Sequence, residues 1–273
     1  MKKILAVLSE YGYWGEELIG PYENLTAAGY KFDFATINGT RPKVIPASID
    51  SNYIDPPLNK PVTSNEVAQK VKEIDSSPIL DNPLNLSKMV PERPYLSAEN
   101  YLRKLEEYYN ELEKVDSFIV EQYSALLLVG GGSILDMGNN QLIHDLVLGF
   151  YRQNKPIAAE CYGVTCLAMA RDIRDRKCIL EGKHVTGHAK EYDYKHDYAY
   201  VNVEGSFDGP PYSLEYILRD AVGANGAFHG NVGSATSVIL DYPFLTGRSV
   251  ESSYLTGEIM VKCLDEGLKR YGW

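Results

Sequence analysis

The amino-acid sequence predicts an α/β protein in which a mostly parallel sheet is sandwiched between helices, with a large insertion after the second strand. Short apolar runs alternate along the chain with longer stretches that are typical of helices. Runs such as Ala-Leu-Leu-Leu-Val at 125–129 are apolar at every position, as in parallel strands buried on both faces. A chain of 273 residues can bury a sizeable core, and we expect a single domain over residues 1–273.

The alternation of runs gives the expected order of elements. The apolar run at 3–8 is followed by Ser9-Glu10 and a Gly/Tyr turn, so it is a first strand and not a targeting segment. Further strands are expected at 31–36, 125–129, 157–160, 185–187, 199–203, 237–240 and 244–246. Helices are expected at 16–28, 97–122, 140–154, 163–170, 212–222 and 248–271. Ligands of such sheets bind at the carboxyl ends of the strands, so the residues that follow the strands are the candidates for function.

The segment 38–94 interrupts this alternation. It carries most of the prolines of the chain, many Asn, Ser and Asp residues, and one amphipathic piece near 65–74. A tract of this length is too long for a simple loop in a compact domain. We therefore expect an insertion that packs over one end of the sheet, where it either roofs a pocket or decorates the surface; the sequence favours neither alternative.

Composition and charge narrow the classes of function. Hydrophobic residues make up 44% and charged residues 23% of the chain, which is typical of a globular protein. The net charge of −10, without clustered Lys or Arg, argues against a nucleic-acid partner. No apolar run has the length of a membrane span, and four cysteines in a chain this long suit a reducing compartment. We expect a cytoplasmic protein without a membrane partner.

A cysteine follows the expected strand 157–160. In Ala-Ala-Glu-Cys161-Tyr-Gly-Val-Thr-Cys166, small residues allow a sharp turn, and the start of the next helix directs N–H groups at the sulfur. Such surroundings favour the thiolate, the reactive form of cysteine. The alternative is that Cys161 is a small buried apolar residue, as free cysteines usually are. Cys166 is more plausible in the core, and the spacing of Cys178 and Cys263 does not suggest a metal site.

Three glycines at 130–132 follow the strand 125–129. Without Cβ atoms, their backbone N–H groups can face a ligand. Beside a cysteine nucleophile this suits an oxyanion hole formed by the N–H groups of Gly131 and Tyr162, with Gly132 next to it. As an isolated motif, a phosphate-binding loop is an equal alternative, but the Lys-Ser/Thr pair of a P-loop is missing.

Together these blocks resemble the ThiJ/PfpI superfamily. The resemblance includes Gly15-Glu16-Glu17-Leu18-Ile19-Gly20-Pro21, the Gly run, the cysteine motif and His184-Val-Thr-Gly-His188. It covers residues 3 to about 256 except the insertion, and it implies a flavodoxin-like fold similar to the class I glutamine amidotransferase domain. Blocks 211–218 and 244–253 look like the larger branch of the superfamily, which holds glyoxalase III enzymes and holding chaperones.

The resemblance implies roles for further residues. Glu17, four residues before Pro21, is similar to a family carboxylate that contacts the nucleophile. Burial would keep it protonated, so that it could donate to a thiolate; from the residues alone, a solvated carboxylate is the alternative. In the glyoxalase III branch a His follows the cysteine, and here that position is Tyr162. Asp193 lies near the place of the acid that orients that His, and His188 takes the place of a His that smaller members carry near their cysteine.

The residues His184, His188, Asp193 and His196 also invite a metal interpretation, but their spacing fixes no ligand geometry. We therefore predict neither a metal nor a cofactor. The residues expected to carry the chemistry are Cys161, Glu17, His188 and Asp193, with Gly131, Gly132 and Tyr162 binding the oxyanion or substrate.

The resemblance favours cysteine-dependent chemistry on a small carbonyl compound: conversion of a 2-oxoaldehyde to a 2-hydroxy acid, as in glyoxalase III. A hydratase, lyase or amide hydrolase that uses the same cysteine is one alternative. A thiol sensor or holding chaperone, in which Cys161 is oxidised reversibly, is another. The expected partner is a small-molecule substrate, and the sequence leaves open whether a homodimer forms.

Overall fold

A computed structural model describes residues 2–55, 59–195, 199–200, 210–230 and 237–273. Its centre is an eight-stranded sheet in the order β14-β12-β13-β7-β6-β1-β2-β5. The strands from β13 to β5 in this order are parallel. At the other edge β12 pairs in antiparallel orientation with both of its neighbours, β13 and β14. This mostly parallel sheet confirms the expected fold class. These strands are β1 (Lys3–Val7), β2 (Lys31–Thr36), β5 (Leu84–Asn85), β6 (Ala125–Leu128), β7 (Ile157–Glu160), β12 (Val238–Asp241), β13 (Phe244–Gly247) and β14 (Arg270–Tyr271).

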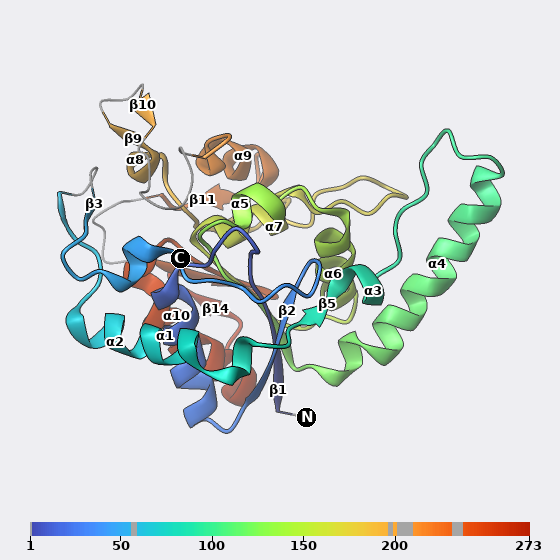
Figure 1. Ribbon diagram of the computed structural model, residues 1–273. Helices are drawn as coiled ribbons and strands as arrows, with labels where there is room; N and C mark the ends of the chain where they lie inside the picture. The colour runs from blue at the N-terminus through green and yellow to red at the C-terminus, as the bar shows by residue number, and fades with distance from the viewer. Residues whose placement is uncertain (1, 56–58, 196–198, 201–209, 231–236) are drawn as a thin grey trace.

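Helices cover both faces of this sheet (Figure 1). On one face lie α1 (Gly15–Ala27), α2 (Asn65–Ser76) and α10 (Ser253–Val261); on the other lie α4 (Tyr101–Phe118), α6 (Gln141–Arg152), α7 (Thr165–Met169) and α9 (Leu214–Ala221). Alternate side chains of β1 enter the two cores: Ile4 and Ala6 pack toward α1 and α10, and Leu5 and Val7 pack toward α4 and α6. Short elements complete the described part: α3 (Leu86–Met89), α5 (Ser133–Asp136), α8 (Lys190–Asp193), β3 (Ile54–Asp55), β4 (Lys60–Pro61), β8 (His184–Val185), β9 (Tyr194–Lys195), β10 (Ala199–Tyr200) and β11 (Ala227–Phe228).

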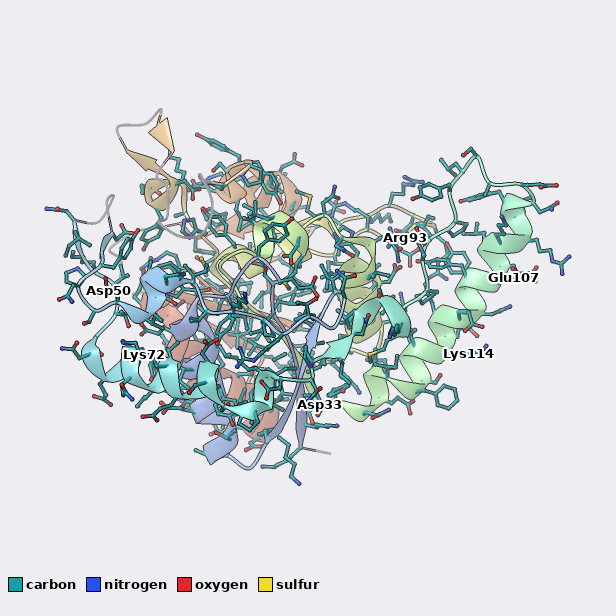
Figure 2. All side chains as sticks on the ribbon, viewed as in Figure 1. Asp33, Asp50, Lys72, Arg93, Glu107 and Lys114 are labelled. Atoms are coloured by element: carbon teal, nitrogen blue, oxygen red, sulfur yellow. The ribbon has the colours of Figure 1, made fainter. Side chains whose placement is uncertain are left out.

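Charged side chains mark the outer surfaces of this layered arrangement. On α2 and α4, Lys72, Glu107 and Lys114 point away from the body of the protein and are exposed (Figure 2). The opposite sides of the two helices carry buried apolar residues, among them Val71 and Leu112. The two helices are therefore amphipathic, and their apolar sides attach them to the sheet.

Three expected elements differ from the structure. The helix expected at 248–271 is wrong at both ends, because α10 ends in a π-helical turn (Lys262–Glu266) and the chain then forms β14. Gly267, at φ +73°, takes the left-handed conformation that ends helices. The strand expected at 185–187 pairs with β11 in a small separate sheet and not with the main sheet. Of the strand expected at 199–203, only β10 lies within the described residues.

The segment 38–94 contributes to the fold in two ways. Its β5 extends the main sheet by pairing with β2, and its α2 packs against α1. Ser64 begins α2 as a cap, since its side chain accepts a hydrogen bond from the N–H of Val67.

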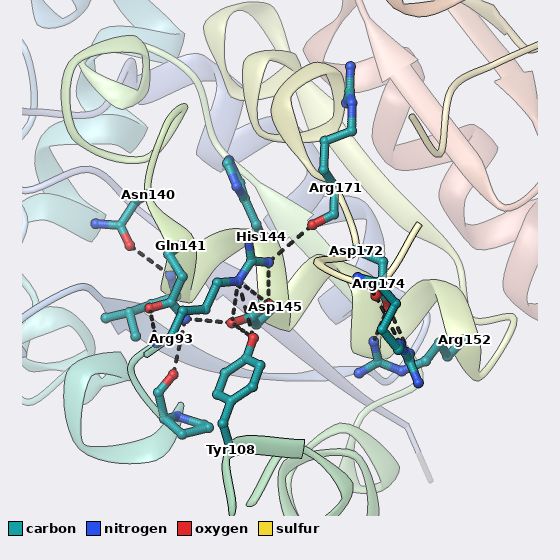
Figure 3. Close-up of polar contacts among 12 residues, drawn as sticks. Arg93, Tyr108, Asn140, Gln141, His144, Asp145, Arg152, Arg171, Asp172 and Arg174 are labelled. Carbon is teal, nitrogen blue, oxygen red and sulfur yellow. Dashed lines mark hydrogen bonds and ion pairs between the residues drawn. The ribbon is translucent and has the colours of Figure 1, made fainter. Parts of the chain in front are cut away.

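A buried polar cluster fastens the far end of this segment to the helices that cover the sheet (Figure 3). Asp145 on α6, which is 1% exposed, forms an ion pair with Arg93 and accepts a hydrogen bond of 2.6 Å from the hydroxyl of Tyr108 on α4. The side chain of Gln141 also donates to Asp145 and to the carbonyl of Pro91. A buried carboxylate with this many donors holds the segment in place, provided that each donor is present.

Candidate active site

Cys161 lies directly after β7, at the carboxyl end of the sheet. Its φ of +52° is a left-handed conformation that L residues adopt rarely, and the chain turns there into a 3-10 helix (Cys161–Val164) and then α7. A Cβ atom on Gly163 would lie 2.4 Å from the carbonyl oxygen of Leu128, so only glycine fits two residues after the cysteine. The result is the strand–turn–helix arrangement expected from the sequence, with the Cys161 side chain at the turn.

The imidazole of His188 lies beside this sulfur. The distance from Cys161 Sγ to His188 Nδ1 is 3.1 Å, and His188 Nε2 lies 2.9 Å from Asp193 Oδ1. A carboxylate at Nε2 holds the proton of the neutral ring on that nitrogen, which leaves the lone pair of Nδ1 facing the sulfur. Cys161, His188 and Asp193 therefore form a nucleophile–base–acid array, with a base that can take the thiol proton.

Tyr162 takes part in the same array. Its hydroxyl donates to Asp193 Oδ1, the oxygen that faces His188, and its ring stacks on the imidazole with centroids 4.1 Å apart. Asp193 is 1% exposed, so its charge depends on these two donors. Tyr162, which stands where the glyoxalase III pattern has a His, therefore contacts both Asp193 and His188.

Glu17 approaches the nucleophile from the first turn of α1. It is fully buried, and burial together with the charge of Glu160 raises the pKa of Glu17 well above its usual value, while its contact with Cys161 acts in the opposite direction. A Cβ atom on Gly130 would lie 2.2 Å from Glu17 Oε2 and 2.8 Å from the Cβ of Cys161. Gly130 therefore leaves the space in which the carboxyl and the thiol meet.

An ionised Glu17 disfavours ionisation of the Cys161 thiol, whereas the thiol, as a hydrogen-bond donor, favours the ionised carboxyl. Burial and the nearby Glu17 raise the pKa of Cys161, whereas a backbone hydrogen bond from Tyr162 lowers it. When Glu17 is protonated its repulsion disappears, and His188 and the Tyr162 N–H remain to stabilise a thiolate. Burial raises the pKa of both groups, so a thiolate at Cys161 depends on a protonated Glu17 and on His188 to take up the thiol proton.

The glycine run meets the loop before α1. Gly132 donates its N–H to the carbonyl of Gly12 at 2.8 Å, and Trp14 donates to the carbonyl of Gly130 at 3.4 Å. Between these two hydrogen bonds, Gly131 and Tyr13 lie opposite each other as an antiparallel pair. In such a pair the N–H and C=O groups of each residue point away from the other residue. Gly131 lines the pocket and its N–H points away from Tyr13, whereas the N–H of Gly132 is already used by Gly12.

The pocket above Cys161 is small, with a volume of about 80 Å³. Four residues of the segment 38–94 line it, namely Ile45, Tyr53, Asp55 and Val62. That segment therefore covers part of the pocket, as one of the two sequence-based alternatives proposed. The remaining wall comes from the loops at the carboxyl ends of the strands and includes Trp14, Glu17, Gly131, Cys161, Tyr162, His188, Tyr192, Asp193, Pro210, Ser249, Val250 and Glu251.

Sequence reasoning missed two carboxylates near the nucleophile. Glu160, the last residue of β7, is fully buried; it accepts a hydrogen bond of 2.8 Å from Ser252 Oγ, and burial raises its pKa to about 8. Glu160 could have been noticed in the sequence, because it is the one charged residue of an otherwise apolar strand. Glu251, which accepts hydrogen bonds from Tyr192 and Arg248, lies in a block that only the resemblance had singled out.

Of the residues in the metal interpretation, His188 and Asp193 are in contact, whereas His184 lies elsewhere. His184 contacts His229, with 2.9 Å between their ring nitrogens, and stacks on Trp273; it does not line the pocket. His196 lies outside the described residues. In the part of the chain that the structure describes, no three His, Cys, Asp or Glu side chains are arranged to hold a metal ion. The helices of the same part are each too short or too polar to cross a bilayer.

Comparison with known proteins identifies the family of the chain. A family model described as ThiJ/PfpI family-like matches residues 8–183, which is more than half of the chain. Glutamine amidotransferase-like class 1 domain-containing protein 1 of Xenopus laevis is 27% identical over 148 residues, which are 53% of this chain and 58% of that protein. The match therefore spans little more than half the length of that relative.

Solved structures share the fold over nearly the whole chain. The Rapid Encystment Protein 24 kDa of Francisella tularensis aligns at a TM-score of 0.65 and 22% identity, over 97% of this chain and 99% of that one. Glyoxalase III of Candida albicans aligns at 0.63 and 16% identity, over 96% and 97%. DJ-1beta of Drosophila melanogaster aligns at 0.52 and 17% identity, over 96% and 90%. The chain belongs to the ThiJ/PfpI family, with a class I glutamine amidotransferase-like fold, as its sequence motifs predicted.

Proposed function

We propose that this protein converts a 2-oxoaldehyde and water into a 2-hydroxy acid, with Cys161 as the nucleophile and without a cofactor. The supporting observation is the convergence on one sulfur of an oriented base, His188 at 3.1 Å, and a buried carboxyl, Glu17, whose pKa burial raises well above its usual value, as suits a group that both donates and accepts a proton. Either group alone would suit many cysteine enzymes, whereas the isomerisation needs both.

In the first step, Cys161 adds to the aldehyde carbon and its proton passes to His188 Nδ1. The resulting imidazolium is stabilised by Asp193, whose Oδ1 lies 2.9 Å from Nε2. Negative charge develops on the former aldehyde oxygen, where the N–H groups of Gly131 and Tyr162 would bind it. Protonation of that oxygen by His188 completes a hemithioacetal.

In the second step, Glu17 gives its proton to the oxygen of the neighbouring carbonyl and, now ionised, removes the proton from the carbon bonded to sulfur. It then returns that proton to the neighbouring carbon and takes up the hydroxyl proton of the carbon bonded to sulfur, so that it ends protonated as it began. The electrons move through an enediol, so that the hemithioacetal becomes a 2-hydroxy thioester without any external oxidant. Water, deprotonated by His188, then attacks the thioester; the thiol leaves, and the 2-hydroxy acid is released. A buried carboxyl with a raised pKa is a stronger base than a solvated one, which suits abstraction of a carbon-bound proton.

Amide or thioester hydrolysis is the second candidate, because the Cys161–His188–Asp193 array is sufficient for it without Glu17. The two functions differ in their need for the Glu17 carboxyl. Isomerisation requires Glu17 to accept and return a proton, whereas acyl transfer through Cys161 and His188 does not.

The test is formation of lactate from methylglyoxal by the reduced wild-type protein and by Glu17→Gln. The amide keeps the shape but cannot relay a proton, so lactate formation is expected to fall by roughly 10²–10⁴-fold. Alkylation of Cys161 by iodoacetamide is expected to persist in the variant. Glu23→Gln, on the same helix and away from the pocket, is the matched control and should keep wild-type turnover.

Two outcomes would contradict the proposal. If folded wild-type protein with reactive Cys161 produced no 2-hydroxy acid from methylglyoxal, phenylglyoxal or glyoxal, the isomerase function would be excluded. A panel of amides and thioesters would then test hydrolysis. If lactate formed at the wild-type rate in Glu17→Gln, the proton relay would have to be assigned to another group.

A further inference from the structure

The wall of the Cys161 pocket has a marked charge asymmetry. The acidic side chains that line it are Glu17, Asp55, Asp193 and Glu251, and the described lining residues include no Lys or Arg. Among the described lining residues, an anion that enters this pocket would therefore meet four acidic side chains, and His188, when protonated, as the one cationic group. Binding sites for carboxylates usually offer an Arg or Lys to the ligand.

Glu251 is the most exposed of these acidic side chains. Its carboxylate accepts hydrogen bonds from three neighbouring residues. Burial acts to raise its pKa, but hydrogen bonds from Ser249, Tyr192 and Arg248 together hold that pKa below its usual value. The side chain is 41% exposed, whereas the Arg248 side chain behind it is 2% exposed and does not line the pocket. The pocket thus meets the carboxylate of the pair, whereas the guanidinium is not among its lining groups.

The other three acidic side chains do not offset this asymmetry. Glu17 is neutral when its raised pKa keeps it protonated, and it becomes anionic only during proton transfer. Asp193 forms an ion pair with His188 whenever the ring is protonated. Neither carboxyl supplies a positive charge for a ligand carboxylate, and Asp55, from the segment 38–94, is a further acidic lining residue.

The rest of the wall is largely aromatic or aliphatic. Trp14, Tyr53, Tyr162 and Tyr192 contribute rings, and Ile45, Val62 and Val250 contribute aliphatic side chains. Such a surface gains free energy by covering an apolar or aromatic group of a ligand. A cationic group is also compatible with it, because aromatic faces and carboxylates both attract cations.

We propose that the pocket selects carbonyl compounds with an uncharged or cationic aromatic or aliphatic substituent and excludes those that carry a carboxylate, with Glu251 as the residue that sets this preference. The carbonyl part of the statement rests on the proposed function, whereas the charge preference concerns access to Cys161 and holds for any reagent. The same asymmetry repels the carboxylate of a 2-hydroxy acid, so the product of the proposed reaction is expelled once it is formed.

The charge preference is tested without turnover, by the rates at which iodoacetamide and iodoacetate alkylate Cys161. Each rate is divided by the rate for 2-mercaptoethanol, which removes the intrinsic difference between the reagents. We expect the normalised preference for the neutral reagent to be roughly tenfold, the combined effect of the acidic side chains of the wall after Arg248, 2.8 Å from Glu251, has offset part of its charge. Glu251→Gln should reduce the preference severalfold. Glu258→Gln removes the same charge from an exposed position of α10 outside the pocket and should leave the preference unchanged.

The substrate class is tested with phenylglyoxal and 4-carboxyphenylglyoxal, which differ by one carboxylate. The expected result is a kcat/KM at least about tenfold lower for the carboxylated compound, mainly through KM, and a smaller difference in Glu251→Gln. Equal normalised alkylation by the two reagents, or a preference unaltered in Glu251→Gln, would overturn the inference, even if glyoxals are turned over. A strong preference without turnover of any glyoxal would support the inference and reject the proposed function.

Discussion

The role of Asp193 gives a prediction that needs no knowledge of the substrate. Asp193→Asn keeps the size of the side chain and removes the charge that faces His188 Nε2 at 2.9 Å. Activation of Cys161 by His188 creates a thiolate and an imidazolium, and Asp193 stabilises the imidazolium. The substitution should therefore lower the fraction of thiolate and, with it, the rate of alkylation of Cys161.

The magnitude follows from the geometry. With the nearest atoms 2.9 Å apart, the centres of the imidazolium and carboxylate charges lie about 4 Å apart. At an effective dielectric constant of about 20 their attraction is about 4 kcal/mol, which corresponds to roughly a thousandfold in an equilibrium constant. Because the remaining Tyr162 hydroxyl and solvent can rearrange toward the new amide, we expect a loss of roughly 10²–10³-fold at neutral pH.

The assay is the pseudo-first-order rate of iodoacetamide labelling of Cys161, measured by mass spectrometry from pH 6 to pH 10. The deficit of Asp193→Asn should shrink as the pH rises, because direct ionisation of the thiol then replaces proton transfer to His188. Asp175→Asn, at an exposed position of the loop after α7, is the control and should label at the wild-type rate. A rate for Asp193→Asn within threefold of wild type, in a folded protein, would refute the reasoning.

Three further substitutions test neighbouring parts of the structure. Tyr162→Phe removes one of the two hydrogen bonds to Asp193 Oδ1, so turnover should fall roughly 10–100-fold with folding intact; an unchanged rate would show that the hydroxyl is dispensable. Glu160 has a folded pKa of about 8 against a usual 4.5, so wild-type stability should fall as the pH rises between these values. Urea unfolding should show a smaller fall in Glu160→Gln, and equal slopes would contradict this. Asp145→Asn should cost about 3 kcal/mol of unfolding free energy, against at most about 0.5 kcal/mol for the exposed control Glu107→Gln; similar losses would contradict a buried ion pair.

The sequence predicted the fold class because the strands β1, β6 and β7 are buried on both faces and therefore read as continuous apolar runs. It failed at the end of the chain for a local reason. Residues 262–271 continue a helical pattern, but Gly267 takes a left-handed conformation and the chain returns as β14. The glycine ends the helix although the helical periodicity continues beyond it. A prediction from periodicity alone does not detect such an end.

The candidate site could be predicted in part. Cys161 was predicted from its local setting, a strand followed by a turn and a glycine, and its φ of +52° agrees with that interpretation. Glu17, His188 and Asp193 were proposed through the resemblance, because their proximity arises from long-range packing that no spacing along the chain reveals. The structure brings His188 and Asp193 into direct contact and places Tyr162 against both.

Glu251 and the acidic wall could not be predicted from the sequence. Glu251 lies 90 residues after Cys161, and its link to Arg248 depends on the turn between β13 and α10. The roof of the pocket depends in the same way on the path of the segment 38–94, whose irregular backbone gives no periodic signal. The glycine run pointed to a loop that lines the pocket through Gly131. That the N–H of Gly132 is bonded to Gly12, and so differs from the N–H of Gly131, follows only from the three-dimensional structure.

The central claim is that Cys161 is an activated nucleophile, and competition among the four cysteines tests it most directly. Cys178 is half-buried, whereas Cys161, Cys166 and Cys263 are buried, so accessibility alone predicts that Cys178 reacts first. Brief treatment of the folded, reduced protein with substoichiometric iodoacetamide, followed by peptide mass spectrometry, measures the order of reaction. The account predicts that Cys161 is labelled before Cys178 and that His188→Ala abolishes this preference. Labelling of Cys178 first, with Cys161 unmodified, would contradict it.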